Sequence, residues 1–148
     1  MTRRVLVVDD NEIVGWTLRA RLWIAGCEVI LAGSAAEALA TLEIERFDLV
    51  LMDLSMPDMT GLEAMEIIEQ RGLCPGTPVV LLTASEDIQN VQAARALGAS
   101  GYLTKAAAQR ALAPAIDRLL AEPGISWIDD HHCIAPAAAR AARPGVAQ

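Results

Sequence analysis

The sequence predicts an α/β fold in which helices cover both faces of one parallel sheet. Five short apolar runs of strand length alternate along the chain with five stretches of helical period. The runs are nearly continuous rather than alternating, as in strands that are buried on both faces. Strand–helix units repeated in this way form a doubly wound sheet with right-handed crossovers. A chain of 148 residues, 53% of them hydrophobic, suits one such domain.

The predicted strands are short runs of valine, isoleucine and leucine, and most of them are followed directly by a polar residue. They are expected at Arg4–Val8, Glu28–Leu31, Leu49–Met52, Val79–Leu82 and Gly101–Leu103.

The predicted helices begin and end at recognisable capping residues. They are expected at Asn11–Ala25, Ala35–Arg46, Leu62–Arg71, Asp87–Leu97 and Ala107–Ala121. Ser34 is a good N-cap, and Gly26, Gly72 and Gly98 stand where a left-handed C-cap is needed. Pro114 lies inside the last helix, so we expect either a kink there or a regular helix that begins only near Ala113.

The composition excludes several classes of partner. A net charge of −7 argues against direct DNA binding, which depends on basic patches. The apolar runs are far shorter than the roughly 20 residues that span a bilayer, and the amino-terminal run is too short for a signal peptide. Three cysteines without a close pair are typical of reduced thiols. We therefore expect a cytoplasmic protein with no membrane contact.

Polar residues follow four of the five predicted strands. Asp9 and Asp10 follow the first strand, Asp53 the third, Thr83 the fourth and Lys105, the only lysine in the chain, the fifth. Because ligand sites in open α/β sheets form at the carboxyl ends of the strands, we expect these five side chains to converge.

This set of side chains suits phosphoryl chemistry. Clustered carboxylates repel one another unless a cation compensates them, and Mg²⁺ prefers oxygen ligands of this kind. Thr83 and Lys105 would supply a donor and a positive charge to phosphoryl oxygens. Asp53, on the central strand, is the candidate nucleophile. Taken singly, Asp10 is equally a helix cap, and only the joint occurrence indicates function.

Four motifs carry a resemblance to a known family: VVDD at 7–10, LMDLSMPDMTG at 51–61, LTA at 82–84 and GYLTK at 101–105. Together they resemble the receiver domain of two-component response regulators, the CheY-like fold. The resemblance covers residues 3–121 and implies a flavodoxin-like (βα)5 sandwich with strand order 2-1-3-4-5. Residues 122–148 are expected to be a partly disordered tail.

The resemblance also implies the roles of the acidic residues. Asp53 would accept a phosphoryl group from a phosphohistidine of a sensor kinase or a histidine phosphotransfer protein. Asp9, Asp10, Asp53 and the backbone carbonyl of Ser55 would hold Mg²⁺.

The same resemblance implies how phosphorylation is read out. Thr83 and Lys105 would contact the phosphoryl group, and Tyr102 matches the switch aromatic that turns inward when the threonine moves. The surface formed by the fourth helix, fifth strand and fifth helix would then change for a downstream protein target. Such a domain assists its own phosphorylation and dephosphorylation but is not otherwise an enzyme.

Ala106 stands where many receivers carry proline, and this departure is shared by receivers of the NarL/FixJ type. Only 26 residues follow Glu122, too few for the helix-turn-helix output domain of those proteins. We interpret the chain as a stand-alone receiver. The alternatives are a truncated NarL-type transcriptional regulator or the receiver module of a larger system.

Two other classes of function fit the sequence less well. A phosphohydrolase of the haloacid dehalogenase kind would need an aspartate in place of Ser55, and a pseudo-receiver would lack the complete acidic set.

Two tryptophans on the first predicted helix lie outside its apolar stripe. Trp16 and Trp23 are seven residues apart, whereas Val14, Leu18 and Leu22 form the stripe. Partial burial against a neighbouring helix is one explanation. Our hypothesis is a surface for a partner protein or for a second copy of the chain, including a homodimer formed on phosphorylation.

Overall fold

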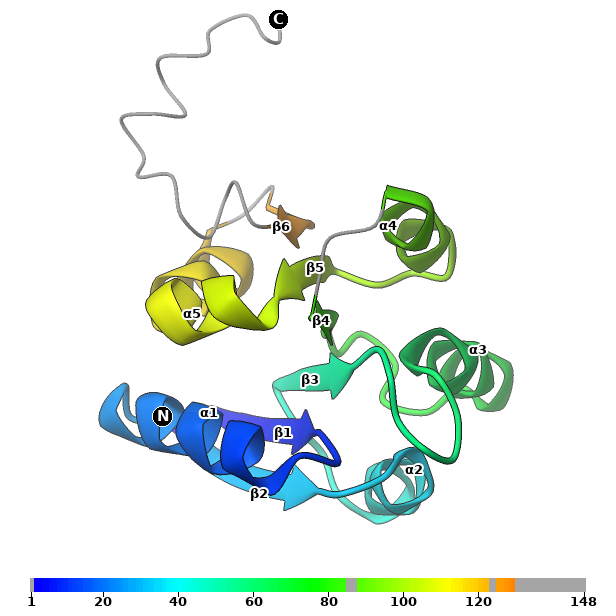
Figure 1. Cartoon of the computed structure of the whole chain (residues 1–148), viewed down its shortest axis with the longest axis horizontal. Helices are drawn as coiled ribbons and strands as arrows, with labels where there is room; N and C mark the ends of the chain where they lie inside the picture. Colours follow the sequence, from blue (N-terminus) through cyan, green and yellow to red (C-terminus); the bar gives the residue numbers. More distant parts are fainter. Residues whose placement is uncertain (1, 85–87, 123–124, 130–148) are drawn as a thin grey trace, which may run out of the picture.

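One parallel sheet runs through the molecule and carries helices on both faces (Figure 1). The computed structural model describes residues 2–84, 88–122 and 125–129. Its strand order is β2-β1-β3-β4-β5-β6, which confirms the order expected for the first five strands. The strands are β1 (Arg4–Val8), β2 (Glu28–Ala32), β3 (Leu49–Asp53), β4 (Val79–Thr83), β5 (Gly101–Thr104) and β6 (Ile128–Asp129).

The helices divide between the two faces of the sheet, with α1 and α5 on one side and α2, α3 and α4 on the other (Figure 1). Their bounds are α1 (Glu12–Ile24), α2 (Ala35–Ile44), α3 (Gly61–Arg71), α4 (Ile88–Ala96) and α5 (Lys105–Ala121). Asp87, the expected first residue of the fourth helix, lies outside the described residues.

Side chains cap several of the helices, including Ser34, the N-cap expected from the sequence. Asn11 accepts hydrogen bonds from the first turn of α1, and Ser34 does so for α2. Thr60 and Glu63 form a reciprocal capping box at the start of α3, which ends at Gly72 in the left-handed conformation (φ 64°). The kink expected from Pro114 is present: Ala111, three residues earlier, has non-helical backbone angles.

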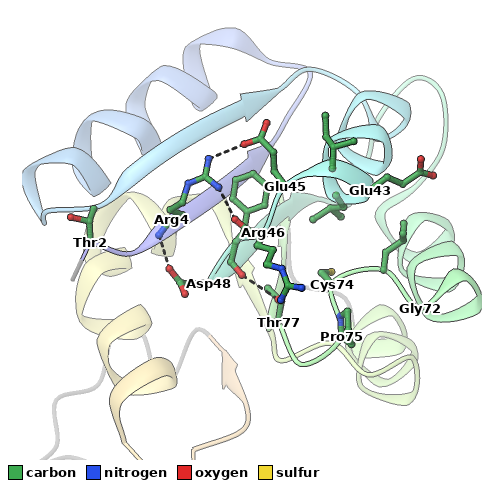
Figure 2. Close-up of a pocket in the computed structure, with 14 residues that line it drawn as sticks. Thr2, Arg4, Glu43, Glu45, Arg46, Asp48, Gly72, Cys74, Pro75 and Thr77 are labelled. Carbon is green, nitrogen blue, oxygen red and sulfur yellow. Dashed lines mark hydrogen bonds and ion pairs between the residues drawn. The ribbon is translucent and has the colours of Figure 1, made fainter.

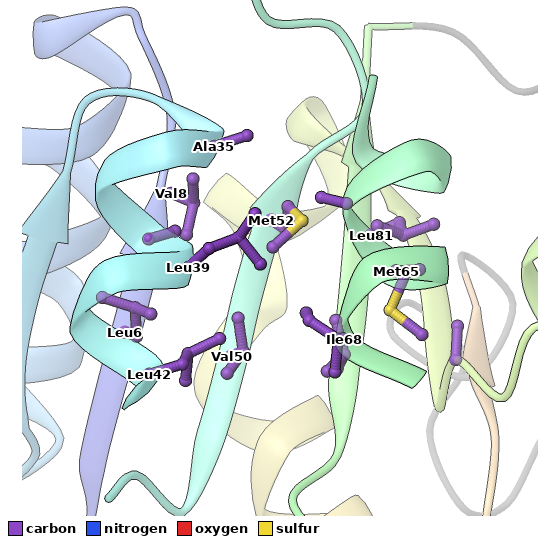
Figure 3. Packing of buried hydrophobic residues seen from close by; sticks show 14 of the residues in the cluster. Leu6, Val8, Ala35, Leu39, Leu42, Val50, Met52, Met65, Ile68 and Leu81 are labelled. Atoms are coloured by element: carbon purple, nitrogen blue, oxygen red, sulfur yellow. The ribbon is translucent and has the colours of Figure 1, made fainter. Parts of the chain in front are cut away.

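The core has two layers because both faces of the sheet are covered. Between the sheet and helices α2 and α3, aliphatic side chains from the strands interdigitate with those of the helices (Figure 3). Residues of this layer include Leu6, Val8, Leu39, Leu42, Val50, Met52, Met65, Ile68 and Leu81. The strand positions are fully buried, which explains why the runs in the sequence are continuous.

The sixth strand was not expected. Ile128 and Asp129, from the segment assigned to the tail, pair in parallel with Gly101 and Tyr102 of β5. Residues 123–124 and 130–148 of that segment lie outside the described residues. Within the described part of the chain, no helix has both the length and the apolar character that crossing a membrane requires.

Candidate functional site

The register of the sheet aligns the carboxyl ends of its four central strands. Paired residues at these ends are Val8 with Met52, Asp53 with Leu82, and Thr83 with Thr104. Asp9 directly follows β1 and Lys105 directly follows β5. The alignment therefore gathers Asp9, Thr83 and Lys105 around Asp53 at one edge of the sheet.

Lys105 joins the two buried carboxylates. Its Nζ atom lies 3.1 Å from Oδ2 of Asp9 and 3.3 Å from Oδ2 of Asp53. The side chain of Asp9 is fully buried and that of Asp53 is 4% exposed. The other oxygen of each accepts a backbone hydrogen bond, from Asn11 to Asp9 at 2.8 Å and from Ser55 to Asp53 at 3.3 Å. Both carboxylates are thus fixed by their own loops.

The side chains surround a cavity of about 410 Å³. Its lining residues are Asp10, Asn11, Asp53, Leu54, Ser55, Thr83, Ala84, Asn90 and Lys105. Most of the polar residues expected at the site therefore share one cavity with Asp53. Asn90, in the first turn of α4, was missed, because a single amide on a helix has no distinctive signal in the sequence.

Three carboxylates lie close together beside one lysine, and two of them, Asp10 and Asp53, line the cavity. One oxygen each from Asp9, Asp10 and Asp53 lies within 4.8 Å of the others. Asp10 is exposed on the cavity side, whereas Asp9 and Asp53 are buried. An all-oxygen donor set with an excess of negative charge fits a hard divalent cation such as Mg²⁺.

The pKa values of Asp53 and Lys105 reflect the excess of negative charge at the site. Burial raises the pKa of Asp53 to about 6, the charge of Asp9 adds to the rise, and Lys105 opposes it. Burial alone would lower the pKa of Lys105, but its contacts with Asp9 and Asp53 outweigh burial and the pKa is raised. Lys105 is therefore a permanent positive charge beside the nucleophile candidate.

A larger cavity, of about 660 Å³, lies at the opposite ends of the strands (Figure 2). Arg4 lines this cavity, and its guanidinium group contacts several neighbouring residues. Its guanidinium donates to Glu45 at 2.8 Å and to the carbonyl of Arg46 at 2.7 Å, and it lies 4.9 Å from the ring of Phe47. These contacts tie β1 to the loop before β3. The groups are paired with one another, so we assign this cavity to the structure of the fold rather than to chemistry.

The remaining predicted residues lie away from the cavity. Tyr102 is 2% exposed and belongs to the core layer on the α4 side. Trp16 and Trp23 are 55% and 71% exposed on α1, so more than half of each side chain is open to solvent.

Comparisons with known proteins agree with this geometry. Residues 5–117 match the family model described as the response regulator receiver domain. The chain is 30% identical over 125 residues to the probable transcriptional regulatory protein TcrX of Mycobacterium tuberculosis, covering 84% of this chain and 53% of TcrX. It is 39% identical over 116 residues to the transcriptional regulatory protein GlrR of Escherichia coli, covering 78% of this chain and 26% of GlrR. The chain thus spans about half or less of the length of these relatives.

A solved structure is similar over most of both chains. The CheY-like response regulator receiver domain protein of Methanospirillum hungatei is 32% identical, with a TM-score of 0.75 over 82% of this chain and 96% of that one. The family match includes every residue that lines the cavity. The chain belongs to the response regulator receiver domain family of two-component signalling.

Proposed function

We propose that Asp53 is the phosphoacceptor of this receiver and that its donor is a phosphohistidine. A carboxylate oxygen of Asp53 attacks phosphorus, the bond between phosphorus and the imidazole nitrogen breaks, and its electron pair stays on that nitrogen. The product is an aspartyl phosphate. The observation that carries this proposal is the placement of Lys105 within 3.3 Å of Asp53 in a cavity lined with acids.

Two side chains would stabilise the transferring group. Lys105 exchanges its contact with the Asp53 oxygen for one with a phosphoryl oxygen, and the Thr83 hydroxyl donates to another. Mg²⁺, held by Asp9, Asp10, Asp53 and the backbone carbonyl of Ser55, would supply further positive charge to the phosphoryl oxygens when bound. Thr83 is buried at the end of β4 and lines the same cavity as Asp53, which supports this role.

The aspartyl phosphate is a temporary state. Water attacking phosphorus breaks the bond to the Asp53 oxygen and releases inorganic phosphate, which restores the carboxylate. The same residues would assist both directions, so the chain acts on its own phosphoryl group rather than on an external substrate. The result is a switch that alternates between two charge states at one site.

The outward face of α1 is the proposed docking surface for the donor. Ile13, Trp16, Trp23 and Ile24 are 71%, 55%, 71% and 85% exposed and lie opposite the buried side of the helix. Helix α1 begins directly after Asp10 and Asn11, which line the cavity. An apolar helix of the partner seated on this face would therefore present its phosphohistidine to Asp53. Tryptophan is among the residues enriched at the hot spots of protein interfaces, which supports this role.

Phosphotransfer from a small donor tests the acceptor. Wild-type protein incubated with phosphoramidate and Mg²⁺ should gain the mass of one phosphoryl group, whereas the Asp53→Asn variant should not. Asp48→Asn is the matched control, because it makes the same change at the other end of β3. Labelling of Asp53→Asn at the wild-type level would show that another residue is the acceptor.

Purified histidine kinases, each autophosphorylated with labelled ATP, test the docking face. We expect the Trp16→Ala/Trp23→Ala variant to be labelled at least about tenfold more slowly than wild type by the best kinase donor, with unchanged labelling by phosphoramidate. Equal rates with both donors would exclude this face. A change of oligomeric state with no change in transfer would assign the face to a second copy of the chain.

The output proposed for this chain is contact with a downstream protein in the cytoplasm. The net charge of −7 favours protein partners over the phosphate backbone of DNA. Tyr102, two residues before the end of β5, connects the site to the surface of α4, β5 and α5 in this proposal. Phosphorylation-dependent binding in a DNA gel shift would contradict it.

A further inference from the structure

The segment of residues 125–129, which we call the strap, lies along the outer edge of β5. Its two last residues form β6, next to β5 and between the layers of α4 and α5 (Figure 1). The amide of Ile128 donates to the carbonyl of Ser100 at 3.0 Å, and Asp129 pairs with Tyr102. The strap therefore occupies the same surface that the proposed function uses for output.

The strap is held on both faces of the sheet. Ile128 is fully buried and packs in the core layer of α5, and Ile125 packs against the same layer. Trp127 packs instead against the opposite layer, the one that contains Tyr102. Its ring lies 4.5 Å from the guanidinium of Arg95 in α4, a cation–π contact. Such two-sided packing indicates a specific fit rather than a loose edge contact.

Gly101 makes room for this fit. A Cβ atom at that position would lie 2.6 Å from Cγ1 of Ile128 and 2.8 Å from its carbonyl oxygen. No side chain larger than hydrogen is therefore compatible with the strap in this place. The sequence of β5 is adapted to receive the strap at its edge.

We propose that the strap is an internal occupant of the α4–β5–α5 face that holds Tyr102 inside the core and is thereby coupled to the phosphoryl site. The strap pairs with β5 at Tyr102, and Trp127 packs against the core layer in which Tyr102 is 2% exposed. This inference rests on the proposed function, in which an inward tyrosine accompanies Thr83 on the phosphoryl group. A docked strap and a phosphoryl group then favour the same conformation, the one with Tyr102 inside the core.

Coupling of this kind is reciprocal, so it has two measurable consequences. The phosphoryl analogue beryllofluoride, added with Mg²⁺ to the full chain, should slow hydrogen exchange at the Ile128 amide by about fivefold or more. Removing the strap contacts should weaken beryllofluoride binding, measured by calorimetry, by a similar factor. Trp127→Ala removes the contact to Arg95, and Gly101→Ala excludes the strap sterically while leaving the strap residues intact.

Ile44→Ala is the control, because Ile44 is 80% exposed on α2 and belongs to neither surface. It should bind beryllofluoride as wild type does. The inference, but not the proposed function, would be overturned if beryllofluoride left hydrogen exchange at the Ile128 amide unchanged and both strap variants bound it with wild-type affinity. Faster exchange at this amide on adding beryllofluoride would overturn the inference as well. Failure of wild-type protein itself to bind beryllofluoride would overturn the proposed function, and the inference with it.

Discussion

The carboxylate of Asp53, the proposed nucleophile, is destabilised in its charged form by its surroundings. In the absence of metal, its pKa is raised from an ordinary value of 3.8 to about 6, first by burial and then by Asp9. The folded protein binds the proton more tightly than the unfolded chain does. The stabilisation from protonated Asp53 is therefore fully present below pH 3.8 and is lost as the pH rises through about 6.

The Asp53→Asn variant should remove the unfavourable free energy of holding a charged Asp53 in the folded protein at neutral pH. In buffer with a metal chelator at pH 7.5, we expect it to be more stable than wild type by up to about 3 kcal/mol. The difference should shrink as the pH falls towards 4, because wild-type Asp53 then becomes neutral too. Urea unfolding of both proteins across this range measures it. An advantage of Asp53→Asn that does not change with pH would show that the charge of Asp53 is not its cause.

At the scale of single residues, the sequence was most informative where a polar group interrupts an apolar pattern. Asp9, Asp53, Thr83 and Lys105 each follow a buried strand, and that position alone predicted their convergence. Asn90 stands in a helix where an amide is unremarkable, so only tertiary structure could place it at the cavity. The contacts of Lys105 with both Asp9 and Asp53 likewise depend on side-chain geometry, which no spacing specifies.

At the scale of elements, the turn from β3 to α3 positions Asp53 through close backbone packing. Gly61 begins α3, and a Cβ atom there would lie 2.7 Å from the carbonyl oxygen of Asp53 and 3.1 Å from Cα of Leu54. These neighbours are backbone atoms and have little freedom to move.

Gly61→Ala should therefore lower the free energy of unfolding by about 1–3 kcal/mol, the usual cost of overpacking, and slow phosphoryl transfer to Asp53. Gly33→Ala is the matched control, because the nearest atom to its added Cβ would be Oε1 of Glu37 at an ordinary 3.6 Å. Denaturant unfolding and phosphoramidate labelling measure the two effects. A Gly61→Ala variant as stable and as active as Gly33→Ala would contradict this packing argument.

The same turn also supports the neighbouring helix. Asp58 accepts hydrogen bonds from the amides of Ala36 at 2.9 Å and Ala35 at 3.3 Å, in the first turn of α2. Ser34 accepts from the next amide, that of Glu37. The hydrogen bond from Ala36, opposed in part by desolvation and aided by the one from Ala35, lowers the pKa of Asp58.

Asp58→Ala should lower the free energy of unfolding by about 1 kcal/mol at pH 7, as loss of a helix cap does. Because the pKa of Asp58 is lowered in the folded state, its contribution is present above the ordinary value of 3.8 and is lost as the pH falls through the folded value. The gap between variant and wild type in thermal unfolding should therefore close in acid. The exposed Glu66→Ala on α3 is the control, and a gap that persists unchanged at low pH would refute the role of the charge.

Periodicity predicted the elements to within a few residues at most ends, because the central strands β1, β3 and β4 are buried on both sides and several helices have side-chain caps. Strand β6 was not predicted from the sequence. Two paired residues are too short for a pattern, and the decisive feature is the space left by Gly101 on another strand. The kink in α5, in contrast, follows from the chemistry of proline and could be predicted from Pro114 alone.

At the scale of the whole molecule, the acidic site links distant parts of the chain to folding. Asp9 and Asp10 follow β1 whereas Asp53 ends β3, so their oxygens come within 4.8 Å of one another through the parallel register of the sheet. An unfolded chain does not hold these carboxylates together. A cation bound by them would therefore stabilise the folded state by mass action.

Mg²⁺ should accordingly raise the free energy of unfolding of the wild-type protein, by about 2.7 kcal/mol at a concentration one hundred times its dissociation constant. Asp10→Asn should lose most of this gain with little effect on stability in chelator, because Asp10 is exposed at the cavity. Glu66→Gln, which removes an exposed charge from α3, should retain the full gain and so controls for nonspecific screening. Thermal unfolding of the three proteins over a Mg²⁺ series measures these differences. Equal stabilisation of all three would place the cation elsewhere and leave Asp10 as a helix-flanking acid only.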